Sequence, residues 1–244
     1  MNETIREKLI EMLRPARRMV FFGGAGVSTE SGIPDFRSKD GLYSQKYDVP
    51  PETMLSHSYF IRHPEGFFRF YRYKMNALWA KPNTAHETLA QWEAEGRLAA
   101  VVTQNIDGLH QAAGSRNVFE LHGSTHRNYC MQCGKTYGPE AIFDSEEPIP
   151  HCSCGGIIRP DVVLYEEGLD NATVQSAIRA IMEADVMIVA GTSLTVYPAA
   201  GLLRYFGGDS LILINRDETA MDDQAALCIH EPVGQVLGEV RGKR

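Results

Sequence analysis

The 244-residue sequence contains no apolar run near the roughly 20 residues that a membrane-spanning helix needs. Residues 1–13 are charged and helix-like and lack the apolar core of a secretory signal, so we expect a cytoplasmic protein. Basic residues are in deficit, with 24 Lys and Arg against 31 Asp and Glu, which gives a formal net charge of −7. Non-specific nucleic-acid binding needs positive charge to displace counterions, so this class of partner is also excluded.

Cysteine is scarce, and the sequence shows neither an internal repeat nor a low-complexity segment. Hydrophobic residues make up 43% and charged residues 23%, which is ordinary for a globular protein and too apolar for disorder. Four of the five cysteines lie close together. In a cytosolic protein that pattern indicates a metal site before disulfides.

Short apolar runs predict the strands of a buried sheet. They cover residues 19–22, 98–102, 186–190 and 211–214, and turn or polar residues bound each of them. Parallel strands that are covered on both faces have this pattern. Because helical segments lie between the runs, we predict an α/β fold with a Rossmann-like, doubly wound parallel sheet. Two stretches interrupt the alternation, an aromatic-rich one over 35–81 and a cysteine-bearing one over 127–159.

Three helices are expected from sequence patterns. The first covers residues 4–13, with Thr4 and Glu7 spaced as a capping box. The other two have apolar positions on one helical face. These positions are Ala85, Leu89 and Trp92 in one segment, and Val174, Ile178, Ile181 and Met182 in the other.

A glycine turn follows the first predicted strand, as in dinucleotide-binding proteins. Gly24 and Gly26 would let the backbone approach a pyrophosphate, which the amides of a following helix N-terminus can bind. Thr29 takes the place of the third glycine, and no second strand ends in an acidic residue about 20 positions on, so an ordinary dehydrogenase site is poorly matched. Phe36 and Arg37 could cover a nucleotide and pair with its charge, or Phe36 could simply pack on the core.

Further polar residues follow the other predicted strands. Gln104, Asn105 and Asp107 supply groups for ribose hydroxyls or a carboxamide, with an Asx-type turn as the alternative. Residues 191–194 could contact a phosphate or ribose, and Asn215 could hold the adenosine side. Strand ends that share one edge of a sheet favour a common ligand crevice.

Histidine is a candidate general base because its side-chain pKa lies near neutrality. His122 stands at a predicted strand end and is followed by glycine. Its rivals, which composition cannot rank, are His110, His126 and His151.

The four clustered cysteines form two close pairs, Cys130-x-x-Cys133 and Cys152-x-Cys154, separated by 18 residues. This spacing fits a tetrahedral zinc ribbon, with four unligated thiols as the alternative. Four thiolates leave no open position for water or substrate, so the zinc should be structural. Cys228 stands apart and is expected to be a buried, inert thiol.

Taken in order, these motifs closely resemble those of the sirtuins, which are NAD-dependent protein lysine deacylases. In particular, the chain resembles a compact, bacterial-type member of that family. The matching segments are residues 24–37 (GAGVSTESGIPDFR), 103–107 (TQNID), 121–123 (LHG), the four cysteines, 191–194 (GTSL) and Asn215. The resemblance implies one catalytic domain over 1–244 that binds NAD and an acyl-lysine peptide in a cleft. Its expected parts are Rossmann-like over about 1–35, 82–125 and 160–244, a helical insert over about 36–81, and a zinc module over about 126–159.

The resemblance also implies residue roles. His122 would be the general base acting on the NAD ribose, with Asn105 and Asp107 at the nicotinamide end. The other implied NAD contacts are Ala25, Thr29, Phe36, Arg37, Gln104, Ile106, Thr192, Ser193 and Asn215, with Phe36 shielding the reacting carbon. The implied zinc ligands are Cys130, Cys133, Cys152 and Cys154, and the implied peptide-binding residues are Val162, Val163 and Tyr165.

The sequence departs from the family pattern in two places. The peptide-binding segment usually reads Val-Val-x-Phe-Gly-Glu, whereas residues 162–167 read Val-Val-Leu-Tyr-Glu-Glu. Strand pairing with the peptide should survive because it uses the backbone, while the added acidic charge favours basic flanking residues. Members that remove succinyl or malonyl groups carry Tyr-x-x-Arg, but here Lys74 follows Tyr71. Lysine lacks the two-pronged grip of a guanidinium on a carboxylate, so we expect acetyl to be preferred over succinyl.

The sequence therefore predicts an NAD-dependent protein lysine deacetylase that transfers acetyl to ADP-ribose and releases nicotinamide. We expect a monomer that acts on acetyl-lysine proteins or peptides and binds neither nucleic acid nor membranes. Three alternatives remain open at this point: an NAD dehydrogenase, a protein mono-ADP-ribosyltransferase, and a non-catalytic zinc-ribbon interaction protein.

Overall fold

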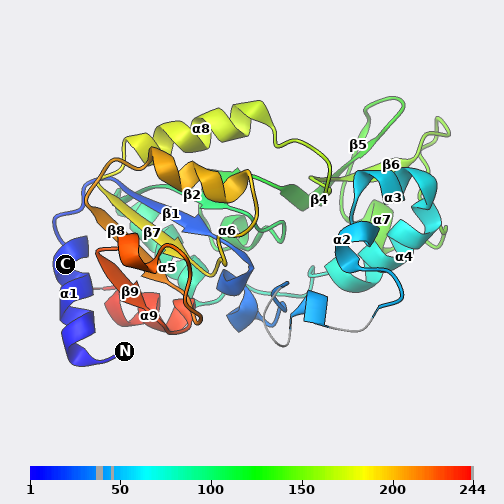
Figure 1. Cartoon of the computed structure of the whole chain (residues 1–244). Helices are drawn as coiled ribbons and strands as arrows, with labels where there is room; N and C mark the ends of the chain where they lie inside the picture. Colours follow the sequence, from blue (N-terminus) through cyan, green and yellow to red (C-terminus); the bar gives the residue numbers. More distant parts are fainter. Residues whose placement is uncertain (37–40, 45–46, 243–244) are drawn as a thin grey trace.

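The computed structural model describes residues 1–36, 41–44 and 47–242 and contains a six-stranded, all-parallel sheet (Figure 1). The strand order is β3-β2-β1-β7-β8-β9. The strands are β1 (Met19–Gly23), β2 (Leu98–Thr103), β3 (Val118–Glu120), β7 (Val186–Ala190), β8 (Ser210–Ile214) and β9 (Leu227–Ile229). The predicted α/β fold with a parallel, doubly wound sheet is confirmed.

Successive residues of each central strand face opposite sides of the sheet, and both sides are covered. Phe21 and Ile188 pack toward α1 (Glu3–Leu13), α5 (Thr84–Ala94) and α9 (Val233–Val240). Phe22 and Met187 pack toward α8 (Asn171–Met182) and the 3-10 helix η4 (Ala199–Tyr205). This double coverage explains why the central strands β1 and β7 carry no polar side chain. We call this sheet, its covering helices and the short α6 (Leu109–Ala112) the large lobe.

A second, antiparallel sheet forms the core of a small lobe, which lies to the right of the large lobe in Figure 1. Its strand order is β5-β4-β6, and it spans residues 123–162, a few residues beyond each end of the zinc module expected over 126–159. Its strands are β4 (Gly123–Cys130), β5 (Thr136–Tyr137) and β6 (Ile158–Val162). The helices around it are α2 (Pro51–Met54), α3 (His57–Arg62), α4 (Pro64–Met75) and α7 (Glu140–Phe143).

The small lobe has an apolar core of its own, which is rich in aromatic rings. Phe60 of α3 and Phe67, Phe68 and Tyr71 of α4 are buried there. They pack on Ile158 of β6. The aromatic-rich stretch of the sequence thus joins the cysteine-bearing stretch in one lobe.

Several expected helix details differ in the structure. The first helix begins at Glu3, and its cap is Asn2, whose side-chain oxygen accepts a hydrogen bond from the Ile5 amide at 2.9 Å, so the capping box at Thr4 is wrong. Asn in an extended conformation is as good a cap as Thr. The end of α8 is also misjudged, because Met182 is 62% exposed. None of the helices among the described residues is long and apolar enough to cross a membrane.

Candidate active site

The glycine turn after β1 brings two strand ends into contact. The Gly26 amide donates a hydrogen bond to the Gly191 carbonyl at 2.8 Å, and a side chain at Gly26 would place its Cβ 2.7 Å from the Gly191 Cα. Only glycine allows this approach between the loops after β1 and β7. The helix expected after the turn is absent, and two 3-10 turns, η1 (Ala25–Val27) and η2 (Thr29–Ser31), take its place. Backbone bonds to the β7 loop favour this tighter path.

Three buried polar side chains meet beside this turn. Ser28 Oγ donates to Asp107 Oδ2 at 2.7 Å, and Asn105 Nδ2 donates to Ser28 Oγ at 3.1 Å. The other Asp107 oxygen accepts the Leu109 amide at 3.0 Å. Sequence reasoning identified Asn105 and Asp107 but missed Ser28 as a side chain of the site. Its only signal is a hydroxyl just beyond the glycine turn.

The ends of β2, β7 and β8 are linked by a chain of hydrogen bonds. Gln104 Nε2 donates to Thr192 Oγ1 at 3.0 Å, and the Thr192 amide donates to Asn215 Oδ1 at 2.9 Å. Asn215 Nδ2 is buried and has no partner among the described residues. An orphaned buried donor at a shared strand edge is the kind of group that a nucleotide would satisfy.

The remaining residues expected at the cofactor lie around the same edge. Ala25 is in η1, and the Thr29 hydroxyl donates to the Gly26 carbonyl at 2.9 Å. The Ser193 hydroxyl is exposed and lies 2.9 Å from that of Thr195.

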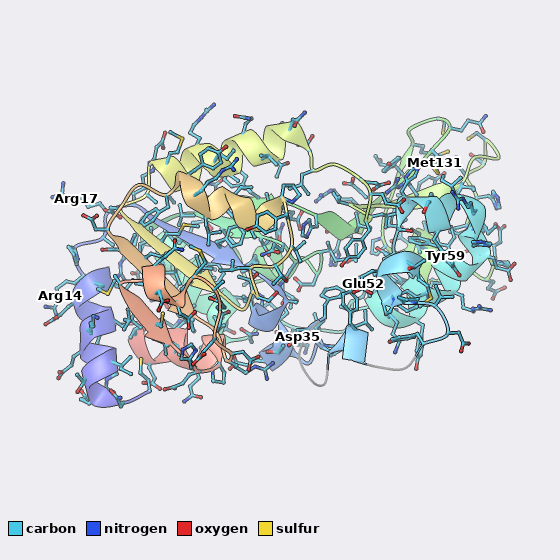
Figure 2. The ribbon with its side chains drawn as sticks, viewed as in Figure 1. Arg14, Arg17, Asp35, Glu52, Tyr59 and Met131 are labelled. Carbon is cyan, nitrogen blue, oxygen red and sulfur yellow. The ribbon has the colours of Figure 1, made fainter. Side chains whose placement is uncertain are left out.

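The segment after the glycine turn connects the two lobes. Figure 2 shows Asp35 between them, and its carboxylate pairs with the Arg216 guanidinium, just past β8, at 3.1 Å. Phe36 is half-buried and packs with Ile106 against the small-lobe core, and its ring contacts Tyr43 edge-on. Arg37, the other expected NAD contact here, lies outside the described residues.

His122 stands between β3 and β4, where the lobes join. Its Nδ1 lies 2.9 Å from the Gln104 carbonyl, which can only accept, so Nδ1 carries the proton. Nε2 has no partner within the described part of the chain and is available as a base. Burial lowers the pKa of His122, and the bond to Gln104 opposes this effect. The imidazole is therefore neutral at pH 7.

The geometry distinguishes His122 from its three rivals. His110 is fully buried against His86, with ring centroids 4.7 Å apart. His126 is exposed and its Nε2 lies 2.9 Å from the Asp107 carbonyl. His151 is exposed in the small lobe and pairs with Glu147 at 3.2 Å.

The four predicted zinc ligands lie together at one end of the small lobe, with all four Sγ atoms within 4.8 Å of one another. The Cys130–Cys154 and Cys133–Cys152 sulfurs are 3.5 and 3.6 Å apart. A tetrahedral zinc with bonds of about 2.3 Å places its sulfurs about 3.8 Å apart, whereas a disulfide needs about 2.05 Å. The cluster therefore fits one zinc ion and no disulfide.

Groups around Cys152 favour the thiolate that a metal requires. The Cys154 amide and the Tyr137 hydroxyl, which lies 2.9 Å from Cys152 Sγ, lower the pKa of Cys152 to about 6. The fifth cysteine, Cys228, is half-buried instead of fully buried as expected. It lies on the short strand β9 beside the 3-10 turn η5 (Asp222–Gln224), and burial raises the pKa of its thiol.

The segment that follows β6 runs alongside His122. The Val163 amide donates to the His122 carbonyl at 2.9 Å, while Val162 pairs with Gly123 in the small sheet. Both backbone groups of Tyr165 are already bonded, its amide to the Leu55 carbonyl and its carbonyl to the amide of His57 at the start of α3, so the expected strand pairing with a peptide would use other residues of the segment. Among the described residues, the Val163 carbonyl and the Glu166 amide have no hydrogen-bond partner and remain available.

The fold and site define an α/β protein with polar side chains gathered at the ends of parallel strands and a second lobe whose four clustered cysteines fit a zinc ion. A family model described as the Sir2 family matches residues 24–198. An NAD-dependent protein deacetylase of Clostridium acetobutylicum is 59% identical over 236 residues, which cover 96% of each chain. One of Clostridium perfringens is 55% identical over 237 residues, which cover 96% of this chain and 97% of that protein. The chain belongs to the Sir2 family.

Solved structures agree with this assignment. One described as Sir2 with p53 peptide and NAD+ has a TM-score of 0.85 at 41% identity, and one of Sir2 bound to acetylated peptide has 0.85 at 39%. In both comparisons 96% of each chain is covered.

Proposed function

We propose that this protein is an NAD-dependent protein lysine deacetylase, which transfers the acetyl group of acetyl-lysine to ADP-ribose and releases nicotinamide. The observation that carries the proposal is the unpartnered Nε2 of a neutral His122, which is bonded to Gln104 at the same strand ends where Ser28, Asn105 and Asp107 are buried. Relatives named NAD-dependent protein deacetylase share up to 59% of the aligned residues, and Sir2 structures described with acetylated peptides share the fold.

NAD supplies a ribose carbon that becomes electrophilic as nicotinamide departs. Asn105 and Asp107 would bind the nicotinamide end, and Ser28 holds both side chains through its hydroxyl. Ile106 would lie beside them. Phe36 would shield the reacting carbon from water with its apolar ring.

The rest of the cofactor would follow the strand edge. Gln104 would contact the ribose, and the residues proposed for the phosphate and adenosine parts are Ala25, Thr29, Arg37, Thr192, Ser193 and Asn215. The buried, unpartnered Nδ2 of Asn215 supports a ligand at this end.

His122 would take a proton from a ribose hydroxyl at Nε2, which makes that oxygen a better nucleophile toward the acyl carbon. The Gln104 carbonyl fixes the tautomer by accepting the Nδ1 proton. Because burial lowers the pKa of His122, the imidazole reaches the reaction in its basic form.

Cys130, Cys133, Cys152 and Cys154 would hold one structural zinc, which would stabilise the small lobe and, with four thiolates closing the site, take no part in the chemistry. Acetyl-lysine peptides are the proposed substrates, with Val162, Val163 and Tyr165 as proposed contacts. We further propose one catalytic domain that acts as a cytoplasmic monomer without affinity for membranes or nucleic acid. The net charge of −7 supports the lack of nucleic-acid binding.

The test is incubation of the protein with an acetyl-lysine peptide, with and without NAD, followed by mass spectrometry. We expect NAD-dependent loss of acetyl, free nicotinamide and O-acetyl-ADP-ribose. ADP-ribosylated protein without deacetylated peptide would indicate a mono-ADP-ribosyltransferase, and reduced nicotinamide a dehydrogenase. Unchanged peptide in the presence of NAD would overturn the proposal.

A further inference from the structure

Glu166 has an unusual backbone conformation. Its φ is +76°, in the left-handed region, and Leu194 is the other non-glycine residue with positive φ in the described part of the chain. Residues with a Cβ rarely adopt this conformation, which glycine adopts freely. Glycine is also what the sirtuin pattern places at this position. The chain therefore keeps the glycine conformation while carrying a glutamate, and some contact must stabilise it.

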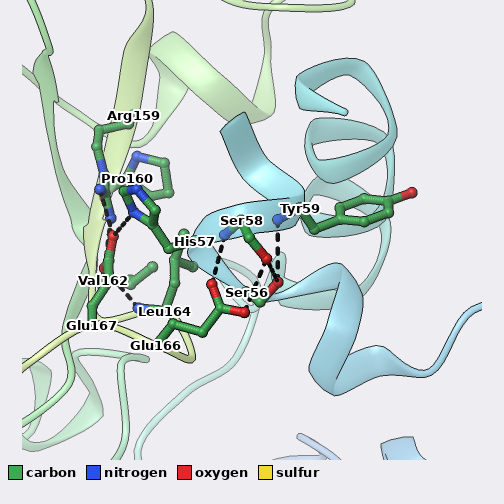
Figure 3. Close-up of polar contacts among 10 residues, drawn as sticks. All are labelled: Ser56, His57, Ser58, Tyr59, Arg159, Pro160, Val162, Leu164, Glu166 and Glu167. Carbon is green, nitrogen blue, oxygen red and sulfur yellow. Dashed lines mark hydrogen bonds and ion pairs between the residues drawn. The ribbon is translucent and has the colours of Figure 1, made fainter. Parts of the chain in front are cut away.

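That contact is with the first turn of α3 (Figure 3). The Glu166 carboxylate accepts hydrogen bonds from the Ser58 amide at 2.8 Å and the Ser58 hydroxyl at 2.9 Å. These two bonds lower the pKa of Glu166, so the side chain is ionised at neutral pH. A glycine at this position would have no group with which to make either bond.

The residues on both sides of Glu166 are fixed as well. The Tyr165 amide donates to the Leu55 carbonyl, and the Tyr165 carbonyl accepts the His57 amide, both at 3.0 Å. The Glu167 carboxylate receives two bonds from Arg159 of β6, at 2.9 and 3.0 Å, and lies 2.8 Å from His57 Nδ1. The turn is thus bonded to α3 on one side and to β6 on the other, as Figure 3 shows.

Both carboxylates are turned toward the protein. Glu167 forms an ion pair with the buried Arg159, and Glu166 is bonded to Ser58. This arrangement weakens the expectation that the two acids attract basic residues flanking the acetyl-lysine. Their contacts indicate a role in holding the segment instead.

We propose that Glu166 is a positioning residue for the acetyl-lysine peptide: its carboxylate, bonded to Ser58, holds the segment 162–167 so that its free backbone groups can pair with the substrate. The proposal rests on the proposed function, because it takes this segment to be the peptide-binding one. The groups in question are the Val163 carbonyl and the Glu166 amide itself. The φ angle of Glu166 sets the direction of its N–H relative to its own side chain, so the Ser58 bonds, which fix that side chain, also fix the direction of the amide. The Val163 carbonyl is held at the other end of the segment by the bond from the Val163 amide to His122.

The test compares the kinetic constants of Glu166→Ala, Glu166→Gly and Glu166→Gln. Loss of the carboxylate in the Ala variant should raise KM for the acetyl-peptide about fivefold, the equivalent of one lost hydrogen bond. The Gly variant also loses both bonds but adopts positive φ without strain, so its KM should rise by a smaller factor. The kcat and the KM for NAD should stay within about twofold, since the polar residues at the strand ends of the large lobe are untouched. Gln keeps an acceptor oxygen for Ser58 and should restore the peptide KM. Wild-type peptide KM in both the Ala and Gly variants would overturn the proposal.

Asp170→Ala is the matched control. Asp170 caps α8 with the same two bonds, from the Thr173 amide and the Thr173 hydroxyl, each at 2.8 Å. Its φ is −64°, and it lies outside the segment 162–167. The control should lower Tm as Glu166→Ala does but leave the peptide KM unchanged. An equal rise in peptide KM in both variants would show a general stability effect and contradict the proposal.

The failure of this proposal can be told apart from failure of the proposed function. The dissociation constant of a fluorescent acetyl-lysine peptide, measured by anisotropy without NAD, should rise about fivefold in Glu166→Ala. A wild-type protein that binds the peptide without deacetylating it would contradict the function alone. Equal affinity of the wild type and Glu166→Ala would contradict the positioning role alone.

Discussion

The two lobes of the molecule are stabilised in different ways. The large lobe buries continuous apolar strands between two layers of helices. The small lobe has a short three-stranded sheet, an aromatic cluster on α3 and α4 and four clustered cysteines at one end. The residues proposed for chemistry follow strands of the large lobe, whereas the proposed peptide segment follows β6 of the small lobe. Under the proposed function, catalysis would be built on the lobe with the continuous parallel sheet, and peptide binding on the lobe with the four clustered cysteines.

Zinc removal should have the largest effect and tests this comparison directly. Structural zinc sites contribute about 10–16 kcal/mol of binding free energy, which is lost on chelation or in Cys152→Ala. We expect the small lobe to unfold and peptide deacetylation to become undetectable, while the parallel sheet stays folded. Hydrogen exchange of β4 and β6, compared with β1 and β7, measures this difference.

Cys228→Ser is the control, because Cys228 lies in the large lobe and outside the cluster. It should retain zinc and activity. If Cys152→Ala exposed the amides of β1 and β7 as much as those of β4, the two lobes would form one cooperative unit and the comparison would fail.

His122→Ala should have the next largest effect. Removing a general base costs about 10²–10⁴ in rate, and Nε2 is the group that His122 offers. Zinc content, the circular dichroism spectrum and peptide affinity should be unchanged, because the bond lost in the structure is the one to Gln104. The control is His151→Ala, an exposed histidine of the small lobe, which should retain full activity.

The pH dependence of kcat/KM gives the wild-type protein an independent check on His122. Burial lowers its pKa, so the basic form persists below the ordinary histidine value of about 6.5. Activity should therefore fall only at a more acidic pH. An acid limb centred above that value would contradict His122 as the buried base.

Two buried histidines should make the large lobe sensitive to acid. Burial lowers the pKa of His86 to about 4 and that of His110 well below its ordinary value. Below about pH 6.5 the unfolded chain binds protons that the folded one does not, so stability decreases as the pH falls. His86 alone should cost about 3 kcal/mol by pH 4, at about 1.4 kcal/mol per pH unit.

Urea unfolding at pH 7.5 and 5.5 measures the decrease in the free energy of unfolding. Effects that all proteins share, such as zinc release at the lower pH, cancel when the decrease is compared between the wild type and its variants. His110→Leu should reduce the pH dependence, since both ring nitrogens of His110 are buried without a partner among the described residues. The exposed His63→Gln should leave it unchanged. Equal slopes in the wild type and His110→Leu would contradict this prediction.

The sequence predicted elements that show a local pattern better than contacts between residues far apart in the chain. β7 was located to the residue because a strand covered on both faces is apolar throughout, and the cysteine spacing directly reflects the geometry of one metal ion. β3 and β9 have three residues each, which is too short for a period to show. Ser28 was missed because its partner Asp107 is 79 positions away. The conformation of Glu166 was hidden because residue type alone argues against positive φ.

Acyl-chain preference is the smallest of the expected effects and concerns the small lobe. Tyr71 is fully buried and stacked between Phe67 and Phe143, whose ring centroids lie 5.5 and 5.6 Å from that of Tyr71. The Lys74 ammonium lies 5.4 Å from the centre of the Tyr47 ring. An ammonium cannot grip a carboxylate with two parallel bonds as a guanidinium does. We therefore expect kcat/KM for an acetyl-peptide to exceed that for the succinyl-peptide by about tenfold or more, in line with the 1–3 kcal/mol that a missing charge-assisted hydrogen bond costs. Lys74→Arg should narrow this ratio, whereas Lys81→Arg, which changes the same atoms outside α4, should not. Equal or faster turnover of the succinyl-peptide by the wild type would show that the small lobe recognises a carboxylate through other residues, and would remove the acetyl preference.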